Sequence, residues 1–97
     1  MVVKGMYVIL VYDIKSDEGG MKVLNKTFKI CKKYLMHIQN SVFEGEITEA
    51  QLMKLQSELK PFIRKDRDSL IVFKCRNEKW IPKEMWGVQE DKTSNFL

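Results

Sequence analysis

The chain is poor in the residues that zinc sites and nucleophilic catalysis require. Its 97 residues include one histidine, His37, and two widely separated cysteines, Cys31 and Cys75. No Cys-x-x-Cys spacing occurs, so the sequence does not support a zinc site, and a lone histidine argues against Ser/His/Asp or Cys/His catalysis. Both cysteines stand in apolar patterns. This favours free buried thiols over a disulfide or a metal pair, and therefore a cytoplasmic protein.

Long hydrophobic stretches and nucleotide-binding motifs are also missing. No apolar run approaches the ~18–20 residues that span a bilayer, and the start of the chain is too quickly polar for a secretory signal. Neither Gly-x-Gly-x-x-Gly nor Gly-x-x-x-x-Gly-Lys occurs, which excludes the common nucleotide cradles. With 44% hydrophobic and 31% charged residues, the sequence predicts one small globular domain without a membrane partner.

Positive charge is concentrated near the start of the chain. Residues 1–35 contain seven lysines against three acidic residues and account for the whole net charge of +4. Such a concentration is typical of a surface that binds phosphate backbones, although a solvated lysine face has the same composition.

The first half of the chain predicts a strand, a loop and a helix. The run "YVILVYDI" (7–14) has no polar alternation and is typical of a strand covered on both faces. "KSDEGG" (15–20) predicts a loop that its two glycines make flexible. A helix is expected from about 21 to 34, with four lysines along one exposed stripe and a buried face made of Met21, Leu24, Phe28, Cys31 and Leu35.

The second half repeats the alternation. "HIQNSVFEGEI" (37–47) has β character and fits either two short strands or one bent strand. Thr48 and Gln51 form a capping-box pattern, which predicts a helix reaching to about Ile63 with Leu52, Leu55, Leu59, Phe62 and Ile63 inward. "RKDRD" (64–68) is expected to be a charged loop before a core strand at 69–75. The order β-α-β(β)-α-β predicts an α+β, ferredoxin-like βαββαβ sandwich with both helices on one face of the sheet.

The C-terminal residues do not fit that core. We expect residues 1–75 to form the domain and residues 76–97 to form a tail. The tail contains an apolar cluster, which consists of Trp80, Ile81, Met85, Trp86 and Val88. Because a small sheet of this kind leaves one face uncovered, these side chains are expected either to cover that face or to pack on a partner subunit, and we favour the partner.

Carboxylates are the remaining source of chemistry. Asp13 ends the first strand, at a position where a parallel-type strand hands over to a loop and often faces a binding crevice. Hard cations such as Mg²⁺ bind carboxylate oxygens. One aspartate cannot hold two metals, but a two-fold dimer brings both copies of Asp13 to its axis. A solvated surface aspartate remains the alternative, and Glu44 and Glu46 fit either further ligands or a wet strand face.

Several stretches in combination resemble the Cas-two family, the small CRISPR-associated protein two. They are "YVILVYDI", "KVLNKTFKICKKYL", "HIQNSVFEGEIT", "AQLMKL" and "RKDRDSLIVFK", and the tail "EKWIPKEMWGVQEDKTSNFL" resembles a subgroup. The resemblance implies a ferredoxin-like homodimer with strand-one aspartates facing each other, Mg²⁺ bound by Asp13, and a tail that reaches the partner's sheet. It also implies spacer acquisition, in which the dimer holds double-stranded DNA between two dimers of the CRISPR integrase.

The alternative function implied by the family is a Mg²⁺-dependent endonuclease that cleaves RNA or DNA. A toxin-like RNA-cleaving or RNA-binding module of the same fold is the third reading. Many members carry arginines after the aspartate, where this chain has "SDEGGMK" with only Lys22 as a basic group. Arginine binds phosphate through a planar fork that lysine lacks. The departure therefore favours the DNA scaffold over the nuclease.

Three sets of site residues follow. The expected catalytic residues are Asp13, Tyr12 and Lys22, with Asp13 also the metal ligand. The expected nucleic-acid contacts are Lys22, Lys26, Lys29, Lys33, His37, Asn40, Ser41 and Phe43; for the last three, turn or core roles are the alternative. The expected partner contacts are Trp80, Ile81, Met85 and Trp86.

Overall fold

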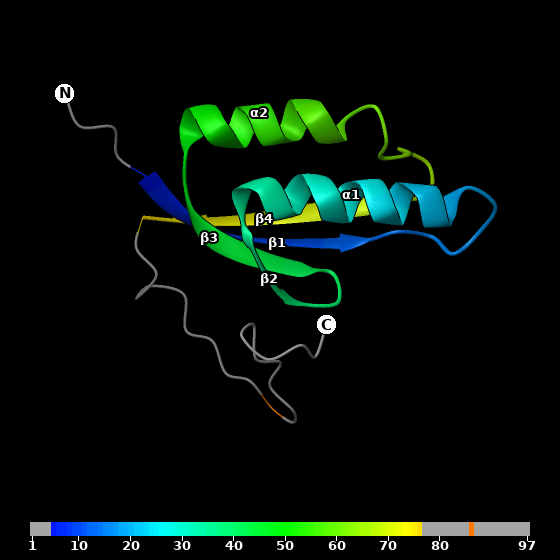
Figure 1. Ribbon diagram of the computed structural model, residues 1–97. Helices are drawn as coiled ribbons and strands as arrows, with labels where there is room; N and C mark the ends of the chain where they lie inside the picture. Colours follow the sequence, from blue (N-terminus) through cyan, green and yellow to red (C-terminus); the bar gives the residue numbers. More distant parts are fainter. Residues whose placement is uncertain (1–4, 77–85, 87–97) are drawn as a thin grey trace.

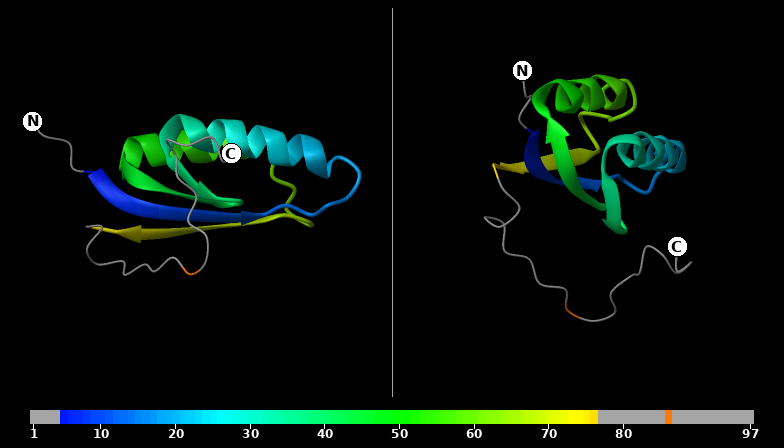
Figure 2. Two further views of the ribbon diagram at one scale, coloured as in Figure 1. Left: turned by 60° about the horizontal axis from the view of Figure 1, so that its bottom comes forward. Right: turned by 60° about the vertical axis from the view of Figure 1, so that its left-hand side comes forward.

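A computed structural model describes residues 5–76 and residue 86. Four strands and two helices alternate in the order β1 (Gly5–Asp13), α1 (Gly20–Tyr34), β2 (Met36–Gln39), β3 (Val42–Thr48), α2 (Glu49–Leu59) and β4 (Ser69–Cys75). The strands form one sheet in the order β2-β3-β1-β4. Both helices lie on the same side of this sheet (Figures 1 and 2). The described helices include none that is long and apolar enough to cross a membrane.

All strand pairs are antiparallel. β1 is central and pairs with β3 on one side and β4 on the other, so that Asp13 lies opposite Ser69. The expectation that β1 is a parallel-type strand is therefore wrong. The segment 37–47 is two strands rather than one bent strand, because Asn40 adopts a positive φ of 35° in the turn between β2 and β3.

The core lies between the sheet and the helices. Alternate β1 side chains, those of Val8, Leu10 and Tyr12, point toward the helices and are at most 3% exposed. β3 contributes Phe43 and Ile47 to the same layer. Because side chains alternate along a strand, the other face of β1 carries Tyr7, Ile9, Val11 and Asp13, which neither of the two described helices covers.

The buried face of α1 differs from the predicted one. The helix buries Val23, Thr27 and Ile30 along with Cys31, whereas Met21 is 68% and Leu24 is 37% exposed. The prediction of Met21 and Leu24 as core residues is wrong, since a second apolar line with the same helical spacing is the one that meets the sheet. Cys31 is buried and Cys75 half-buried, and both are free thiols, as predicted.

The start of α2 follows the prediction and its end does not. The Thr48 hydroxyl accepts from the Gln51 amide at 3.1 Å, and the Gln51 side chain accepts from the Thr48 amide at 2.9 Å, which completes the capping box. The helix ends at Leu59, before Pro61, and not at Ile63. Phe62 and Ile63 are still partly buried against the core from the turn that follows.

Candidate functional site

Asp13 is an exposed carboxylate at the end of a core strand. Its neighbour Tyr12 is buried and Ile14 packs against the core, so the alternation of side chains along the strand places Asp13 on the opposite side. The Asp13 side chain has no hydrogen bond or ion pair within residues 5–76 and 86. Its carboxylate oxygens are therefore available to a ligand from solvent or from a second chain.

A single chain does not surround a cation at this point. Among the described residues, no three His, Cys, Asp or Glu side chains form a group able to hold a metal ion. Asp13 provides a carboxylate of the kind that Mg²⁺ binds, but it can supply only part of the ion's coordination shell. The remaining ligands must come from water, nucleic acid or a second copy of the chain.

Tyr12 and Phe43 lie in the core and not on a binding surface. Tyr12 is 3% exposed, and its ring stacks on Phe43, which is 0% exposed, with the centroids 6.1 Å apart. Burial, together with the nearby Cys31, raises the pKa of Tyr12 to about 12. The structure therefore contradicts both the catalytic role predicted for Tyr12 and the nucleic-acid contact predicted for Phe43.

His37 is also a core residue. Its ring packs edge-on against Phe28 at 4.9 Å and lies 5.0 Å from Phe43, and the residue is 9% exposed. Nε2 lies 3.0 Å from the Asn40 carbonyl oxygen, to which it donates. This position contradicts a direct nucleic-acid contact by His37. The residue instead supports the β2–β3 turn.

Asn40 and Ser41 form that turn and remain at least partly accessible. The carbonyl of Ser41 accepts from the Tyr12 amide at 3.1 Å, which fixes the turn next to the end of β1. Asn40 is exposed and Ser41 is half-buried. The turn brings both residues to the end of the sheet at which Asp13 lies, and their contact with nucleic acid stays a prediction.

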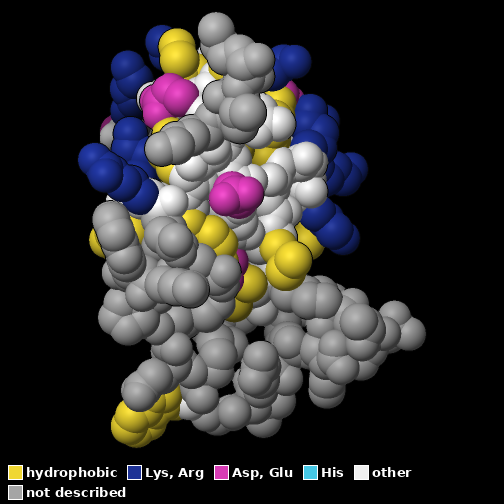
Figure 3. Space-filling model, turned by 90° about the vertical axis from the view of Figure 1, so that its left-hand side faces the viewer, with side chains coloured by type: hydrophobic (Ala, Val, Ile, Leu, Met, Phe, Trp, Pro, Cys, Tyr) yellow, Lys and Arg dark blue, Asp and Glu magenta, His cyan; other side chains and the backbone are white. Residues whose placement is uncertain are grey.

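The four predicted lysines do form one exposed line on α1, but they are not equivalent. Lys33 makes an ion pair with Glu58 of α2, and Lys26 lies over the Phe62 ring at 5.8 Å. Lys22 and Lys29 have no partner within the described part of the chain. In Figure 3, Lys and Arg side chains occupy both flanks of the helix-bearing half, and hydrophobic side chains gather below them.

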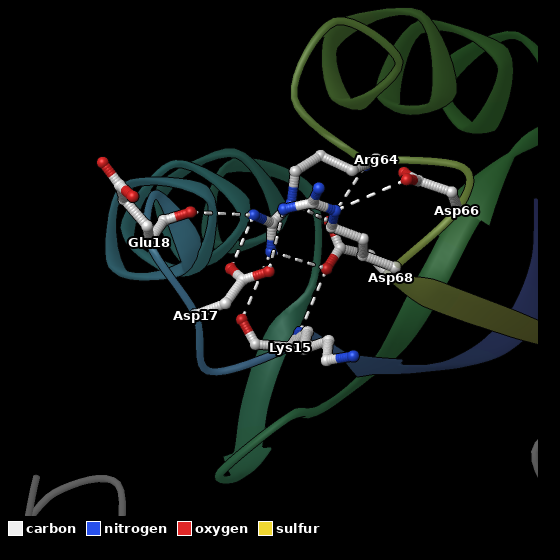
Figure 4. Close-up of polar contacts among 7 residues, drawn as sticks. Lys15, Asp17, Glu18, Arg64, Asp66 and Asp68 are labelled. Carbon is white, nitrogen blue, oxygen red and sulfur yellow. Dashed lines mark hydrogen bonds and ion pairs between the residues drawn. The ribbon is translucent and has the colours of Figure 1, made fainter.

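A cluster of charged residues that sequence reasoning missed lies beside the β1–α1 loop (Figure 4). We call it the Arg64 cluster, and it consists of Asp17, Arg64, Arg67 and Asp68. Arg64 donates from Nη1 to Asp17 at 2.7 Å, and from Nε and Nη2 to the two oxygens of Asp68, each at 3.0 Å. Arg67 donates to the other oxygen of Asp17 at 3.1 Å. The one signal of this cluster in the sequence is the Arg–Asp spacing of four within "RKDRD".

The cluster has a strong effect on ionisation. The side chain of Asp68 is 0% exposed, yet hydrogen bonds from Arg64 lower its pKa to about 2 despite burial. Hydrogen bonds from Arg64 and Arg67 also hold the pKa of Asp17 below its usual value. The same contacts raise the pKa of Arg64. The pKa shifts of Asp17, Arg64 and Asp68 all favour the charged forms, so these three side chains form ion pairs at neutral pH.

Gly19 and Gly20 form a tight turn beside this cluster. Gly19 has φ of 90°, and a Cβ on Gly20 would lie 2.2 Å from the Lys15 carbonyl oxygen. Only glycine fits these two positions. The two glycines are thus required by the geometry of this turn, and the flexibility of the loop stays a prediction. A Cβ built on Gly19 would lie 3.7 Å from Arg64 Nη1. The segment "SDEGGMK" has no arginine of its own, but the guanidinium of Arg64, from the loop before β4, lies beside it.

The predicted tail contacts fall largely outside the described residues. Trp80, Ile81 and Met85 lie there, and Trp86 is 87% exposed.

Comparisons with known proteins agree with this geometry. The model of the CRISPR associated protein Cas2 family matches residues 6–81. A protein of Fusobacterium nucleatum named CRISPR-associated endoribonuclease Cas2 is 59% identical, with 95% of this chain and 87% of that protein covered. A protein of the same name from Methanosarcina acetivorans is 37% identical, with 95% of this chain and 100% of that protein covered.

Solved structures show the same fold. A crystal structure titled as Cas2 has a TM-score of 0.71 at 36% identity and covers 93% of both chains. The structure of Streptococcus pyogenes Cas2 at pH 6.5 has a TM-score of 0.65 at 32% identity and covers 70% of this chain and 83% of that one. The sequence match over most of the chain, together with the shared ferredoxin-like fold, shows that this protein belongs to the CRISPR-associated Cas2 (Cas-two) family.

Proposed function

We propose that the chain is a cytoplasmic CRISPR adaptation protein, a homodimer that binds duplex DNA and bridges two dimers of the CRISPR integrase. The observation that carries this proposal is the exposed lysine line of α1, in which Lys22 and Lys29 have no partner among the described residues. Free ammonium groups on a regular helix bind phosphates without reading bases. A dimer doubles the line and gives a longer basic surface.

The face of the sheet opposite the two described helices supports the homodimer. It carries apolar side chains of the two neighbouring strands β1 and β4, and Ile71 and Phe73 on β4 are 53% and 54% exposed. They lie opposite Val11 and Ile9 of β1 in the strand register. An apolar face of this kind is typical of an interaction surface, and two-fold packing of two copies would bury it while placing both Asp13 residues near the same axis.

The C-terminal segment is proposed as a second contact region. We divide the chain into a core of residues 1–75 and a tail of residues 76–97 that reaches the partner subunit or the integrase. Trp86 supports this role, because a large apolar side chain that is 87% exposed has much surface to bury in a complex. Trp80, Ile81 and Met85 are proposed to bind with it.

A metal-dependent endonuclease is the second candidate. Its supporting observation is the accessible Asp13 carboxylate, which has no partner within the described residues. In the dimer, two copies of Asp13 would hold Mg²⁺, and Lys22 would stabilise the phosphate. When bound, the cation supplies an activated water for phosphodiester cleavage. The relatives from Fusobacterium nucleatum and Methanosarcina acetivorans are named endoribonucleases, which makes RNA a substrate to test beside DNA.

One comparison separates the two candidates. Wild type and Asp13→Ala are titrated with one duplex DNA and one RNA of equal length, with and without Mg²⁺, and with purified integrase in a parallel series. We expect both proteins to bind the duplex and support integration without cutting. Cleavage by wild type that needs Mg²⁺ and is absent from Asp13→Ala would establish the nuclease. Loss of duplex binding in wild type at moderate salt would contradict the scaffold.

A further inference from the structure

A groove runs along one side of α2, between this helix and the edge strand β4. It has a volume of about 720 Å³, a size typical of clefts that hold ligands. β4 is the last strand in the sheet order, so no described strand lies beyond it. No described residue of α1 lines the groove, which is therefore separate from the lysine line proposed to bind DNA.

The floor of the groove is apolar and incompletely covered. In the strand register Leu70 lies opposite Tyr12 and Val72 lies opposite Leu10, and opposed residues of antiparallel strands point to the same face. Leu70 and Val72 therefore point to the helix side of the sheet, yet both are only half-buried. Leu52 of α2 lines the groove as well and is also half-buried. A row of apolar side chains that is left partly exposed is typical of an interaction site.

The rim of the groove is positively charged. Lys60, Lys65 and Lys74 line it, and no aspartate or glutamate does so among the described residues. The three lysines come from the end of α2, from the loop before β4 and from β4 itself. All three are exposed, and none forms an ion pair within residues 5–76 and 86. A partner with carboxylates along its edges complements such a rim.

The length of the groove fits a short helix. With 11 residues, α2 is about 16 Å long. The β4 residues that line the groove extend from Leu70 to Lys74, a distance of about 13 Å along the strand. A partner helix of about two to three turns spans the same length. An amphipathic helix that lays its apolar side into an apolar groove is a common mode of protein recognition.

We propose that the α2–β4 groove binds an acidic amphipathic helix of a partner protein. The apolar side of that helix packs on Leu52, Leu70 and Val72, and its carboxylates pair with the three rim lysines. A nucleic acid fits less well, because its phosphates match the lysines but its backbone has little apolar surface for the floor. The groove lies on the helix side of the sheet, opposite the proposed dimer face, so each protomer of a dimer can bind one helix. The proposal depends neither on duplex binding nor on a cation at Asp13.

The experiment titrates the full-length protein with two synthetic peptides that share one line of leucines at helical spacing. Each peptide has about 14 residues, long enough to form a helix on binding. The first carries glutamate at most other positions, and the second carries lysine there. Binding is followed by NMR of isotope-labelled methyl groups, with Leu52, Ile63, Leu70 and Val72 as reporters in the groove. We expect the glutamate peptide to shift these signals with a Kd of about 10 to 100 µM, and the lysine peptide to bind at least ~10-fold more weakly.

Charge variants of the rim provide the specific test. The double variant Lys65→Glu/Lys74→Glu reverses two charges on exposed side chains. Lys54→Glu is the matched control, because Lys54 is an exposed lysine of α2 that does not line the groove. We expect the double variant to lose at least ~10-fold in affinity for the glutamate peptide and to gain affinity for the lysine peptide, whereas Lys54→Glu stays within about twofold of wild type. Ser57→Trp places a large ring in the groove from an exposed position, leaves the rim charges intact and should also block the glutamate peptide.

Several results would overturn the proposal. If the glutamate peptide at roughly 1 mM shifts none of the reporter methyl signals, the groove does not take an acidic helix. Equal effects of the double variant and Lys54→Glu would show that the rim lysines do not select the partner. The same methyl shifts on addition of duplex DNA in place of the peptide would assign the groove to nucleic acid. Nuclear Overhauser contacts from Val72 to Ile81 or Val88 in the free protein would show that the C-terminal tail of this chain fills the groove instead.

Discussion

Arg64 and Asp17 are joined by a 2.7 Å hydrogen bond although they lie 47 positions apart in the chain. This bond connects the loop that follows β1 to the loop that precedes β4. Asp68 makes a second connection, because its carboxylate accepts from both the Lys15 amide and the Arg64 guanidinium. The two loops therefore form one structural unit at the end of the sheet that carries Asp13.

Asp68→Ala should destabilise the fold strongly. The change leaves the Lys15 amide and the Arg64 guanidinium without their buried acceptor, for a loss of about 2 to 3 kcal/mol in the free energy of unfolding. Urea titration followed by circular dichroism measures this. Asp66→Ala serves as the control, because Asp66 is 77% exposed and within the described chain pairs only with Arg67; its loss should stay below about 0.5 kcal/mol. Equal losses would contradict the buried role of Asp68.

Stability should fall on acidification in a window set by Asp68 and Asp17. Both have a folded-state pKa below the ordinary value of 3.8, and that of Asp68 is about 2. A depressed pKa contributes stability that is complete above the unfolded value and is lost as the pH falls through the folded one. We expect the melting temperature to decrease between pH 4 and pH 2, because folding lowers the pKa of Asp68 from 3.8 to about 2, and to decrease less steeply in Asp68→Asn. Parallel curves would contradict this assignment.

Thr27→Val should stabilise the protein. Thr27 is 0% exposed on the buried face of α1, and its hydroxyl has no hydrogen-bond partner in the described chain. Valine has nearly the same shape and removes the unsatisfied group, for a gain of about 1 kcal/mol in the free energy of unfolding. Thr48→Val is the contrasting variant, since its hydroxyl caps α2, and its loss should cost about 1 kcal/mol. A destabilised Thr27→Val would point to an unseen partner.

The lysines of α1 should differ in their contribution to duplex binding. Each neutralised phosphate contributes ~0.9 to the slope of log affinity against log salt, and a dimer carries each lysine twice, so Lys22→Ala or Lys29→Ala should reduce the slope by about 1 to 2. Lys33→Ala should have a smaller effect, because Glu58 already pairs with it. Fluorescence anisotropy at several salt concentrations measures the slopes, with the α2 variant Lys54→Ala as the control. Equal slopes for all variants would show that the lysine line of α1 is not part of the DNA-binding surface.

Phe73→Glu should dissociate the proposed dimer. The side chain is 54% exposed on the uncovered sheet face, and a two-fold interface would bury two added charges and lose two apolar contacts. We expect at least a ~100-fold rise in the dimer dissociation constant, measured by sedimentation velocity. Met53→Glu on α2, where the methionine is 61% exposed, should not change the association. A dimer that survives Phe73→Glu would place the interface elsewhere.

The sequence predicted the order of elements because strand-like runs and the Thr48–Gln51 capping box are local signals. It failed on the buried face of α1, where the line that contains Met21 and Leu24 and the line that contains Val23 and Ile30 both follow the helical period. Only the sheet decides which of the two lines is covered. Thr27 was passed over because its polarity argues against a core position. The Arg64 cluster was missed for the opposite reason, since "RKDRD" has the composition of a solvated loop and its partner Asp17 is distant in sequence.

The central place of β1 has a consequence for when the Asp13 end of the sheet takes shape during folding. Among the described strands β1 comes first in the chain, and β4, one of its two neighbours, comes last. The hairpin of β2 and β3 needs only local contacts, whereas closing β4 onto β1 joins residues more than 50 positions apart, such as Asp13 and Ser69. Contacts between distant segments carry a larger loop-closure entropy and tend to form late. The helices and the β2–β3 hairpin are therefore expected to form before Asp13 has a defined position. The end of β1 becomes ordered in the step in which β4 pairs with it and completes the sheet.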